Sequence, residues 1–226
     1  MKYIFLFSLF IEIICYKQNE KKVWDFFKSM GLTDSGIAGL MGNLYCESKI
    51  ESIIYENKYH KEIGLTNEEY VKKVNSGEYT IFVNDKAGFD LAQWTFYKRK
   101  QALLNQCFGN IGDMDCQLGY LYYELKNEFS TVLKFLKSSN DIYLCTIQVM
   151  VNFEKPANQS DAAKIYRNSI SQQYYNIFVG VYANIWNYFI SCNISQYAVA
   201  ALIEIYMMKA KWKAEFIILI FIILLD

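Results

Sequence analysis

A helix with a glycine at every third position constrains the fold of this chain more than any other feature. In the segment DSGIAGLMGNLYCES (residues 34–48), apolar residues recur at the three- and four-residue spacing of one helical face. Gly36, Gly39 and Gly42 lie in the same helix. Because each glycine in a helix interior costs up to ~1 kcal/mol, three of them predict that this helix packs closely against another backbone.

Most of the chain between about residues 20 and 178 shows helical periodicity. Thr66 and Glu69 have the spacing of a capping box, which opens one of the helices. Residues 78–90 contain Gly88 and are typical of a loop with a short strand. The expected helices span residues 20–30, 34–48, 66–77, 94–106, 114–129, 141–153 and 160–178. We therefore predict one mainly α-helical domain over residues 20–178, with a small loop and strand region.

The overall composition excludes several classes of protein. Hydrophobic residues make up 53% of the chain and charged residues 20%, which excludes intrinsic disorder. Lys and Arg total 23, as do Asp and Glu, so the chain lacks the basic excess of a protein that binds nucleic acid through phosphates. The single histidine, His60, argues against a histidine-rich metal site. We expect no metal, no cofactor and no nucleic-acid partner.

The first 15 residues are hydrophobic. Their sequence, MKYIFLFSLFIEIIC, resembles a short secretory signal peptide, although Glu12 interrupts the apolar run and no clean cleavage site follows. A buried N-terminal helix or strand is the alternative. We expect a secreted or extracellular protein.

Residues 179–226 form a hydrophobic C-terminal region. The chain carries no charged residue from Asn168 to Ile203. Its final apolar run, FIILIFIILL, has 10 residues, which is about half of the ~20 that a helix needs to cross a bilayer. The run also fits the tail of a lipid-anchor signal, and an apolar helix pair is the alternative. Membrane association through either end of the chain is therefore one expectation.

No two of the six cysteines have the spacing of a CxxC motif, which argues against a zinc ribbon. Export would permit disulfides. Cys107 and Cys116 flank the short segment FGNIGDMD and are the most plausible local pair. Cys46 is either a disulfide partner or a small buried hydrophobic residue.

One carboxyl is a candidate for chemistry. Glu47 lies three residues after Leu44 and seven after Leu40, so it is on the apolar face at the end of the helix. Burial disfavours the charged form of a carboxyl and raises its pKa, and a protonated acid can donate to a leaving oxygen in glycoside hydrolysis. Ser48, the next residue, can hydrogen-bond a carboxyl. On this pattern alone, a solvated glutamate is the commoner explanation.

Three ordered blocks of the sequence resemble the phage tail lysozyme family. They are residues 31–48 (GLTDSGIAGLMGNLYCES), residues 76–104 (SGEYTIFVNDKAGFDLAQWTFYKRKQALL) and residues 153–175 (FEKPANQSDAAKIYRNSISQQYY). The resemblance covers about residues 20–178. It implies a mainly α (α+β lysozyme-like) fold, with the small strand region beside a cleft, and an enzyme that cuts bacterial peptidoglycan.

The resemblance also implies roles for particular residues. The family's N-x-x-x-E-S block, which carries the catalytic acid, matches Asn43, Glu47 and Ser48. Its D-x-x-G-Y-G-L-A-Q-W-T block begins here at Asp85, a candidate second carboxylate whose alternative is a loop cap. Gln93 is similar in placement to the glutamine that lines the cleft of goose-type lysozymes and lytic transglycosylases.

The same block contributes two further candidates. Trp94 either stacks on a sugar or packs in the core below the cleft. Asp90 replaces the second glycine of the block, so it either strains the loop or places another acid at the cleft. We thus expect Ser48, Asp90, Gln93 and Trp94 to bind substrate.

The leading hypothesis is an exported muramidase-like glycosidase in which Glu47 is the general acid. It would cleave the β-1,4 bond between N-acetylmuramic acid and N-acetylglucosamine, either as a hydrolase or as a lytic transglycosylase. The alternatives are a catalytically impaired glycan-binding module of the same fold and a membrane-tethered structural protein.

Overall fold

The computed structural model describes residues 18–180. The signal-like segment 1–15 lies outside the described residues, as do residues 181–226 of the C-terminal region. Within the described part, no helix is both long and apolar enough to cross a membrane. The helices are α2 (Gln18–Ser29), α3 (Asp34–Ser48), α4 (His60–Ile63), α5 (Asn67–Ser76), α6 (Tyr97–Gln106), α7 (Met114–Asn127), α8 (Ser130–Ser138), α9 (Ile142–Val149) and α10 (Asp161–Phe178), with a 3-10 turn at Asn57–Tyr59 and a π-helix at Met150–Glu154.

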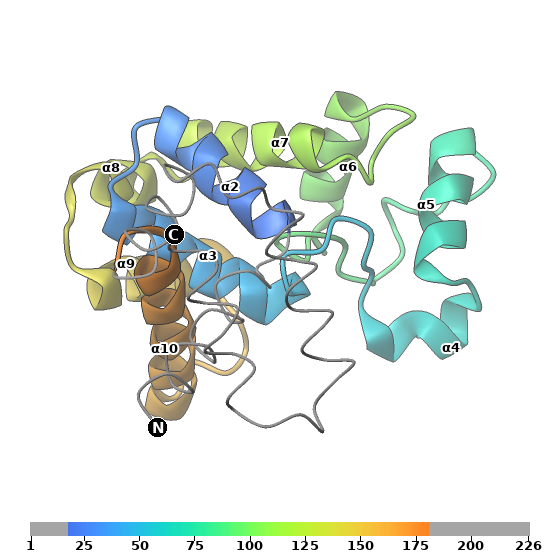
Figure 1. Ribbon diagram of the computed structural model, residues 1–226. Coiled ribbons are helices and arrows are strands. Elements are labelled where there is room, and N and C mark those ends of the chain that lie inside the picture. Colours follow the sequence, from blue (N-terminus) through green and yellow to red (C-terminus); the bar gives the residue numbers. More distant parts are fainter. Residues whose placement is uncertain (1–17, 181–226) are drawn as a thin grey trace, which may run out of the picture. The chain divides into compact units, whose positions relative to one another are not determined.

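Helix α3 is the buried centre of the fold, and it packs against α2, α8, α9 and α10 (Figure 1). Its three glycines lie at three of these contacts. A Cβ at Gly36 would meet the Leu136 carbonyl oxygen at 2.1 Å, and one at Gly39 would meet Cys145 at 2.7 Å. A Cβ at Gly42 would meet the Ser171 Oγ at 2.0 Å. The predicted close packing of this helix is therefore confirmed, against three different helices.

The mainly α-helical fold class is confirmed. Residues 78–96 form turns, and within the described part of the chain their pairing is limited to isolated bridges rather than a strand. Phe89 bridges to both Tyr55 and Trp94. Because the Trp94 backbone is engaged with Phe89, α6 begins at Tyr97 and not at Trp94 as the periodicity suggested.

Other helical features also differ from the sequence-based expectation, among them the short helix α4, which was not predicted. Helix α8 was not predicted, although its apolar face, with Val132, Leu133 and Leu136, is buried. Its nine residues are too few to give a clear periodic signal. The expected helix over residues 141–153 is α9 followed by the π-helix, which ends at Lys155 in a left-handed conformation with φ 52°.

Helices α4 and α5 are set to one side of the helices around α3 (Figure 1). The capping box of α5 is confirmed, with Thr66 and Glu69 each bonded to the other's backbone. Aromatic rings pack beneath this helix, where Tyr70 stacks on Tyr55 with ring centroids 4.4 Å apart and contacts Phe89.

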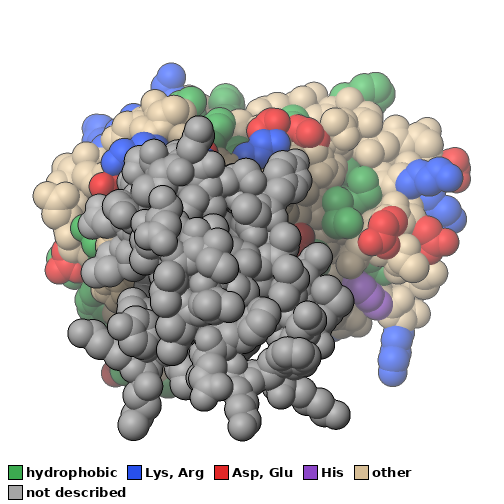
Figure 2. Space-filling view, in the orientation of Figure 1, with side chains coloured by type: hydrophobic (Ala, Val, Ile, Leu, Met, Phe, Trp, Pro, Cys, Tyr) green, Lys and Arg blue, Asp and Glu red, His purple; other side chains and the backbone are tan. Residues whose placement is uncertain are grey.

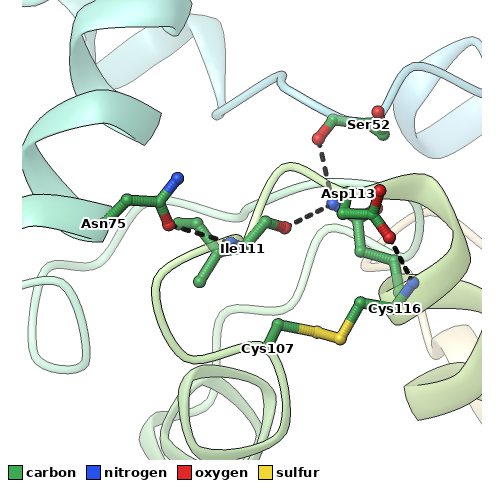
Figure 3. Close-up of a disulfide and its surroundings, with 7 residues drawn as sticks. Ser52, Asn75, Cys107, Ile111, Asp113 and Cys116 are labelled. Carbon is green, nitrogen blue, oxygen red and sulfur yellow. Dashed lines mark hydrogen bonds between the residues drawn. A yellow bond between two sulfur atoms is a disulfide. The ribbon is translucent and has the colours of Figure 1, made fainter.

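The predicted disulfide is confirmed between Cys107 and Cys116 (Figure 3). The loop that it closes is tied to α5, because the Asn75 side chain accepts a hydrogen bond from the Ile111 backbone N–H at 2.9 Å. Asp113 caps α7 by accepting from the Cys116 N–H at 2.8 Å. The disulfide therefore fixes the connection between α6 and α7.

Charged side chains of both signs occur among the described residues. Figure 2 shows Lys and Arg lying among Asp and Glu on the face in view. This distribution agrees with the net charge of zero.

Candidate active site

Glu47 lies in the last turn of α3 and pairs with an arginine of α10. Its Oε1 accepts a hydrogen bond from Arg167 Nη2 at 2.6 Å. The Glu47 side chain is 19% exposed and that of Arg167 is 10% exposed. Glu47 is thus partly open to solvent and held in one orientation by a nearly buried cation.

A buried asparagine holds Arg167 in place. The Asn43 Oδ1 accepts from Arg167 Nη1 at 3.0 Å, and the Asn43 amide donates to the carbonyl oxygens of Gly39 and Thr146. Asn43 has no exposed surface. Because Gly42 lacks a Cβ, α10 can approach close enough for this contact. The N-x-x-x-E pattern therefore supplies both Glu47 and the residue that positions its arginine partner.

The arginine changes the chemistry expected of Glu47. The sequence suggested a carboxyl in apolar surroundings, whereas the structure places the Arg167 guanidinium in contact with it. Beside it, burial raises the pKa of the Cys46 thiol, which disfavours the thiolate that a nucleophile needs. At this helix end the Glu47 carboxyl is therefore partly exposed and paired with a cation, whereas the Cys46 thiol is disfavoured as a nucleophile.

Ser48 ties the end of α3 to the loop that follows residue 85. Its hydroxyl is buried and lies 3.2 Å from the Leu44 carbonyl oxygen and 3.1 Å from that of Leu91. Ser48 therefore holds the two predicted blocks together, and in this structure its hydroxyl faces the protein interior.

Asp90 occupies a backbone conformation that favours glycine. Its φ is 71°, which accounts for the glycine at this place in the family's block. The side chain is fully buried, and neither carboxyl oxygen has a partner in normal hydrogen-bond geometry. Burial raises the pKa of Asp90 well above its ordinary value, and the Leu91 backbone N–H opposes that shift. Its carboxyl is closed off from solvent, so it offers no surface to a substrate in this conformation.

Gln93 is half-buried at the end of the same turn. Its side-chain amide donates to the Asp90 carbonyl oxygen at 3.1 Å, and its backbone φ is also positive, at 45°. A Cβ at Gly88 would lie 2.8 Å from the Gln93 Oε1. A side chain at position 88 would therefore displace the Gln93 amide, whereas the family's glycine at the position of Asp90 matches the positive φ found there.

Asp85 is part of a different, buried ion pair. It contacts the Lys100 ammonium group and accepts a hydrogen bond from the Tyr70 hydroxyl at 2.6 Å. The side chains are 5% and 0% exposed. Burial lowers the pKa of Lys100, and Asp85 opposes that shift. The structure does not join Asp85 to Glu47, and its position favours the loop-stabilising alternative.

Trp94 has no exposed surface and lies in the core. Its indole N–H donates to Glu124 Oε2 at 2.7 Å, and Glu124 also accepts two hydrogen bonds from Arg99. The structure thus favours the core alternative for Trp94 over sugar stacking.

No pattern in the sequence predicted a role for Glu154. This residue ends the π-helix and is half-buried, and its Oε1 is enclosed without a hydrogen-bond partner. Burial raises the pKa of Glu154 well above its ordinary value, the Glu47 charge raises it further, and Arg99 and Arg167 oppose the shift. The one signal in the sequence was its place in the third block, FEKPAN.

The remaining candidate sites among the described residues were a metal site and two surface hollows. No cluster of three or more metal-ligating side chains occurs among the described residues. A hollow of about 200 Å³ lies beside α5 and α6 and includes Val74 and Phe108. Another, of about 560 Å³, includes Tyr143 and Gln172. Neither hollow is lined by Glu47.

Comparison with known proteins agrees with the geometry. A family model described as phage tail lysozyme matches residues 18–178, which contain Glu47, its partner Arg167 and the loop of Gln93. No curated protein matches the chain. The family consists of lysozyme-like enzymes that degrade peptidoglycan, and the helical fold is consistent with it. The chain therefore belongs to the phage tail lysozyme family.

Proposed function

We propose that this protein is an exported glycosidase that cleaves the β-1,4 bond between N-acetylmuramic acid and N-acetylglucosamine in peptidoglycan. Glu47 is the general acid of the reaction. The observation that carries the proposal is the partly exposed Glu47 carboxyl, fixed by Arg167 at 2.6 Å at the end of a buried helix. A fixed orientation is what a proton donor needs to meet one substrate oxygen.

In this mechanism Glu47 donates its proton to the glycosidic oxygen as the C1–O bond breaks. Negative charge then develops on Glu47, and Arg167 stabilises that charge through the contact already in place. The Arg167 contact therefore stabilises the transition state more than it stabilises the state before proton transfer. This difference in stabilisation accelerates the reaction. The oxocarbenium-like sugar is captured by water or by its own 6-hydroxyl group, which gives a hydrolysed or an anhydro product.

Two features support export. The first 15 residues resemble a signal peptide. The disulfide between Cys107 and Cys116 is of the kind that persists in oxidising compartments.

A second candidate function is a glycan-binding module of the same fold with impaired catalysis. The observation that favours it is Asp90, which holds a positive φ next to the loop of Gln93. Strain of this kind costs on the order of 1 kcal/mol or more and can displace a cleft residue.

The test is digestion of purified peptidoglycan by the full chain, followed by turbidity and by mass analysis of the released fragments. We expect wild type to release disaccharide peptides, whose mass distinguishes a hydrolysed from an anhydro end. Glu47→Gln should lose ~100-fold or more of the rate, since general acids contribute about that much. Glu68→Gln, on the exposed face of α5, is the matched control.

Each outcome separates the candidates. Clearing by Glu47→Gln at the wild-type rate would overturn the role of Glu47. Sedimentation of the wild-type chain with peptidoglycan, without any fragment released, would favour the glycan-binding module.

A further inference from the structure

A surface hollow lies between the start of α9 and the middle of α10, and the proposed mechanism does not use it. Its volume of about 560 Å³ is within the range of pockets that bind small ligands. Its polar and aromatic lining consists of Ser139, Asn140, Asp141, Tyr143, Asn168 and Gln172. The hollow therefore has both the size and the polar groups of a binding site.

The hollow lies at the opposite end of α3 from Glu47. The Ser35 hydroxyl, in the first turn of α3, donates to the carbonyl oxygen of Asn140 at 3.0 Å. Glu47 is in the last turn of the same helix, so the rise along α3 separates the two places by roughly 18 Å. The hollow is thus a different site from the Glu47 carboxyl.

The walls of the hollow are held in place by the packing of α9 on α10 (Figure 1). The hydroxyl oxygens of Thr146 on α9 and Ser171 on α10 lie 2.8 Å apart, and neither residue has exposed surface. Asp141 caps α9 by accepting from the Leu144 N–H at 2.9 Å. Side chains on helices that are fixed in this way need little ordering when a ligand binds.

One wall carries an enclosed amide oxygen that lacks a hydrogen bond. Asn168 Oδ1, on α10, has no hydrogen-bond partner among the described residues. An enclosed acceptor of this kind is unfavourable because its hydrogen bonds to water have been lost without replacement. A ligand that brings a hydroxyl or an amide N–H to Asn168 would supply the missing bond.

The chemistry of the lining fits a neutral sugar. Tyr143 is 44% exposed, so its ring offers an apolar face to the C–H groups of a sugar ring. The side-chain amides of Asn140, Asn168 and Gln172 supply both donors and acceptors, which the hydroxyl and N-acetyl groups of amino sugars require. Among the described residues that line the hollow, Asp141 is the one charged group, and a carboxylate does not attract the acidic stem peptides of peptidoglycan.

We propose that this hollow is a second carbohydrate-binding site, which holds a glycan segment of peptidoglycan away from the catalytic carboxyl. The identity of the glycan rests on the proposed function. A second contact with an insoluble polymer raises the effective concentration of glycan near Glu47 and leaves the chemical step unaltered. The site should therefore govern affinity for intact peptidoglycan and have no effect on the turnover of short soluble fragments.

The test compares the full-length chain with Tyr143→Ala and Asn168→Ala in two assays. Binding is measured by sedimentation with purified peptidoglycan in a Glu47→Gln background, so that the polymer is not cut. Turnover is measured with short soluble peptidoglycan glycans in the presence of Glu47. We expect each substitution to weaken peptidoglycan binding ~5-fold or more, with an unchanged rate on the soluble glycans.

Matched variants separate binding from folding. Tyr143→Phe keeps the ring and should retain most of the affinity. Tyr123→Ala removes a tyrosine of α7 that is 52% exposed, and it should bind peptidoglycan as the unsubstituted chain does. Asn168→Ala should not lower the melting temperature, because the oxygen that it removes has no partner among the described residues.

An NMR titration with a β-1,4-linked oligomer of N-acetylglucosamine locates the sugar directly. The signals of Tyr143 and Asn168 should shift with this oligomer and should not shift with a soluble stem peptide. Shifts at these residues with the stem peptide alone would contradict a carbohydrate site.

Unchanged peptidoglycan binding in folded Tyr143→Ala and Asn168→Ala would overturn the inference and leave the role of Glu47 intact. Loss of turnover on soluble glycans in folded Tyr143→Ala would also overturn it, because the hollow would then be part of the catalytic site. A chain that binds peptidoglycan through Tyr143 but releases no fragment from it would instead refute the proposed function and leave the second site standing.

Discussion

The fold contains two arginine–glutamate pairs that differ in what surrounds them. Glu124 is completely buried and accepts hydrogen bonds from Arg99, from the Trp94 indole and from the Tyr120 hydroxyl at 3.1 Å. Glu47, with 19% of its side chain exposed, accepts from Arg167 on one oxygen. The first carboxylate is saturated with protein donors, whereas the second presents part of its surface to solvent.

This difference separates a structural ion pair from one suited to chemistry. Removing one member of a buried pair is strongly destabilising because the other charge is left without compensation. A partly exposed carboxyl can instead exchange protons with a substrate while its arginine keeps it oriented. The buried pairs should therefore govern stability, and the Glu47 pair should govern activity.

The buried pair of Asp85 and Lys100 extends the comparison and gives the largest expected stability effect. Asp85→Asn leaves the Lys100 ammonium buried without its carboxylate and should cost ~3–5 kcal/mol of unfolding free energy. Lysis measured well below the melting temperature should be retained. Denaturant unfolding and turbidity check the two statements.

The double variant Asp85→Asn, Lys100→Met is the control, because it buries no ammonium group. It should regain a large part of the lost stability. Complete loss of lysis in a folded Asp85→Asn protein would show instead that Asp85 takes part in catalysis.

The next prediction concerns the packing that brings α10 to α3. Gly42→Ala places a methyl group 2.0 Å from the Ser171 Oγ and 2.9 Å from the Arg167 carbonyl oxygen, so α10 must shift. We expect a loss of ~1–3 kcal/mol from overpacking. Lysis should also fall, because the shifted helix carries Arg167.

Gly119→Ala in α7 is the matched control, since its Cβ would meet only the Gln106 amide, at 3.3 Å. This change should be neutral or stabilise the protein by up to ~1 kcal/mol through helix propensity. Equal effects of the two substitutions on thermal melts would contradict the packing argument.

Asp90 gives the smallest expected effect, and the size of this effect depends on pH. Asp90→Gly relieves the strain of a non-glycine residue at a positive φ and removes a buried carboxyl. It should therefore stabilise the protein by ~1 kcal/mol or more near neutral pH. Because burial raises the folded-state pKa of Asp90, wild type loses stability as pH rises above the ordinary Asp pKa of ~4. The advantage of Asp90→Gly over wild type should therefore grow from acid towards neutral pH.

Asp90→Asn separates the two causes, since it keeps a non-glycine residue at the positive φ but carries no charge. Its stability should be independent of the Asp90 titration while most of the strain remains. If the difference in melting temperature between wild type and both variants were constant with pH, the buried carboxyl would not be the cause. Increased lysis in Asp90→Gly would show that the strain reaches Gln93.

Local patterns in the sequence were sufficient for much of the fold. The spacing of apolar residues predicted most helices, and Thr66 with Glu69 marked the start of α5. The three glycines predicted the close packing of α3. These signals are local because each depends on residues within one or two helical turns.

The partners of the site residues could not be predicted in the same way. Arg167 lies 120 positions from Glu47, and only the packing of α10 on α3 joins them. The indole of Trp94 meets Glu124, 30 positions away, so a residue expected at the cleft is in the core. Glu154 becomes notable only through an enclosed oxygen and the charges around it.

The most direct test of the comparison measures lysis and thermal stability on Glu47→Gln and Glu124→Gln side by side. Both substitutions remove the charge of a glutamate that is paired with arginine. We predict that Glu47→Gln keeps a melting temperature close to wild type and loses ~100-fold or more of the lytic rate. Glu124→Gln should lose ~3 kcal/mol or more of stability and retain lysis while it is folded. The opposite pattern, in which Glu47→Gln unfolds easily but still lyses peptidoglycan, would contradict the assignment of Glu47 as the general acid.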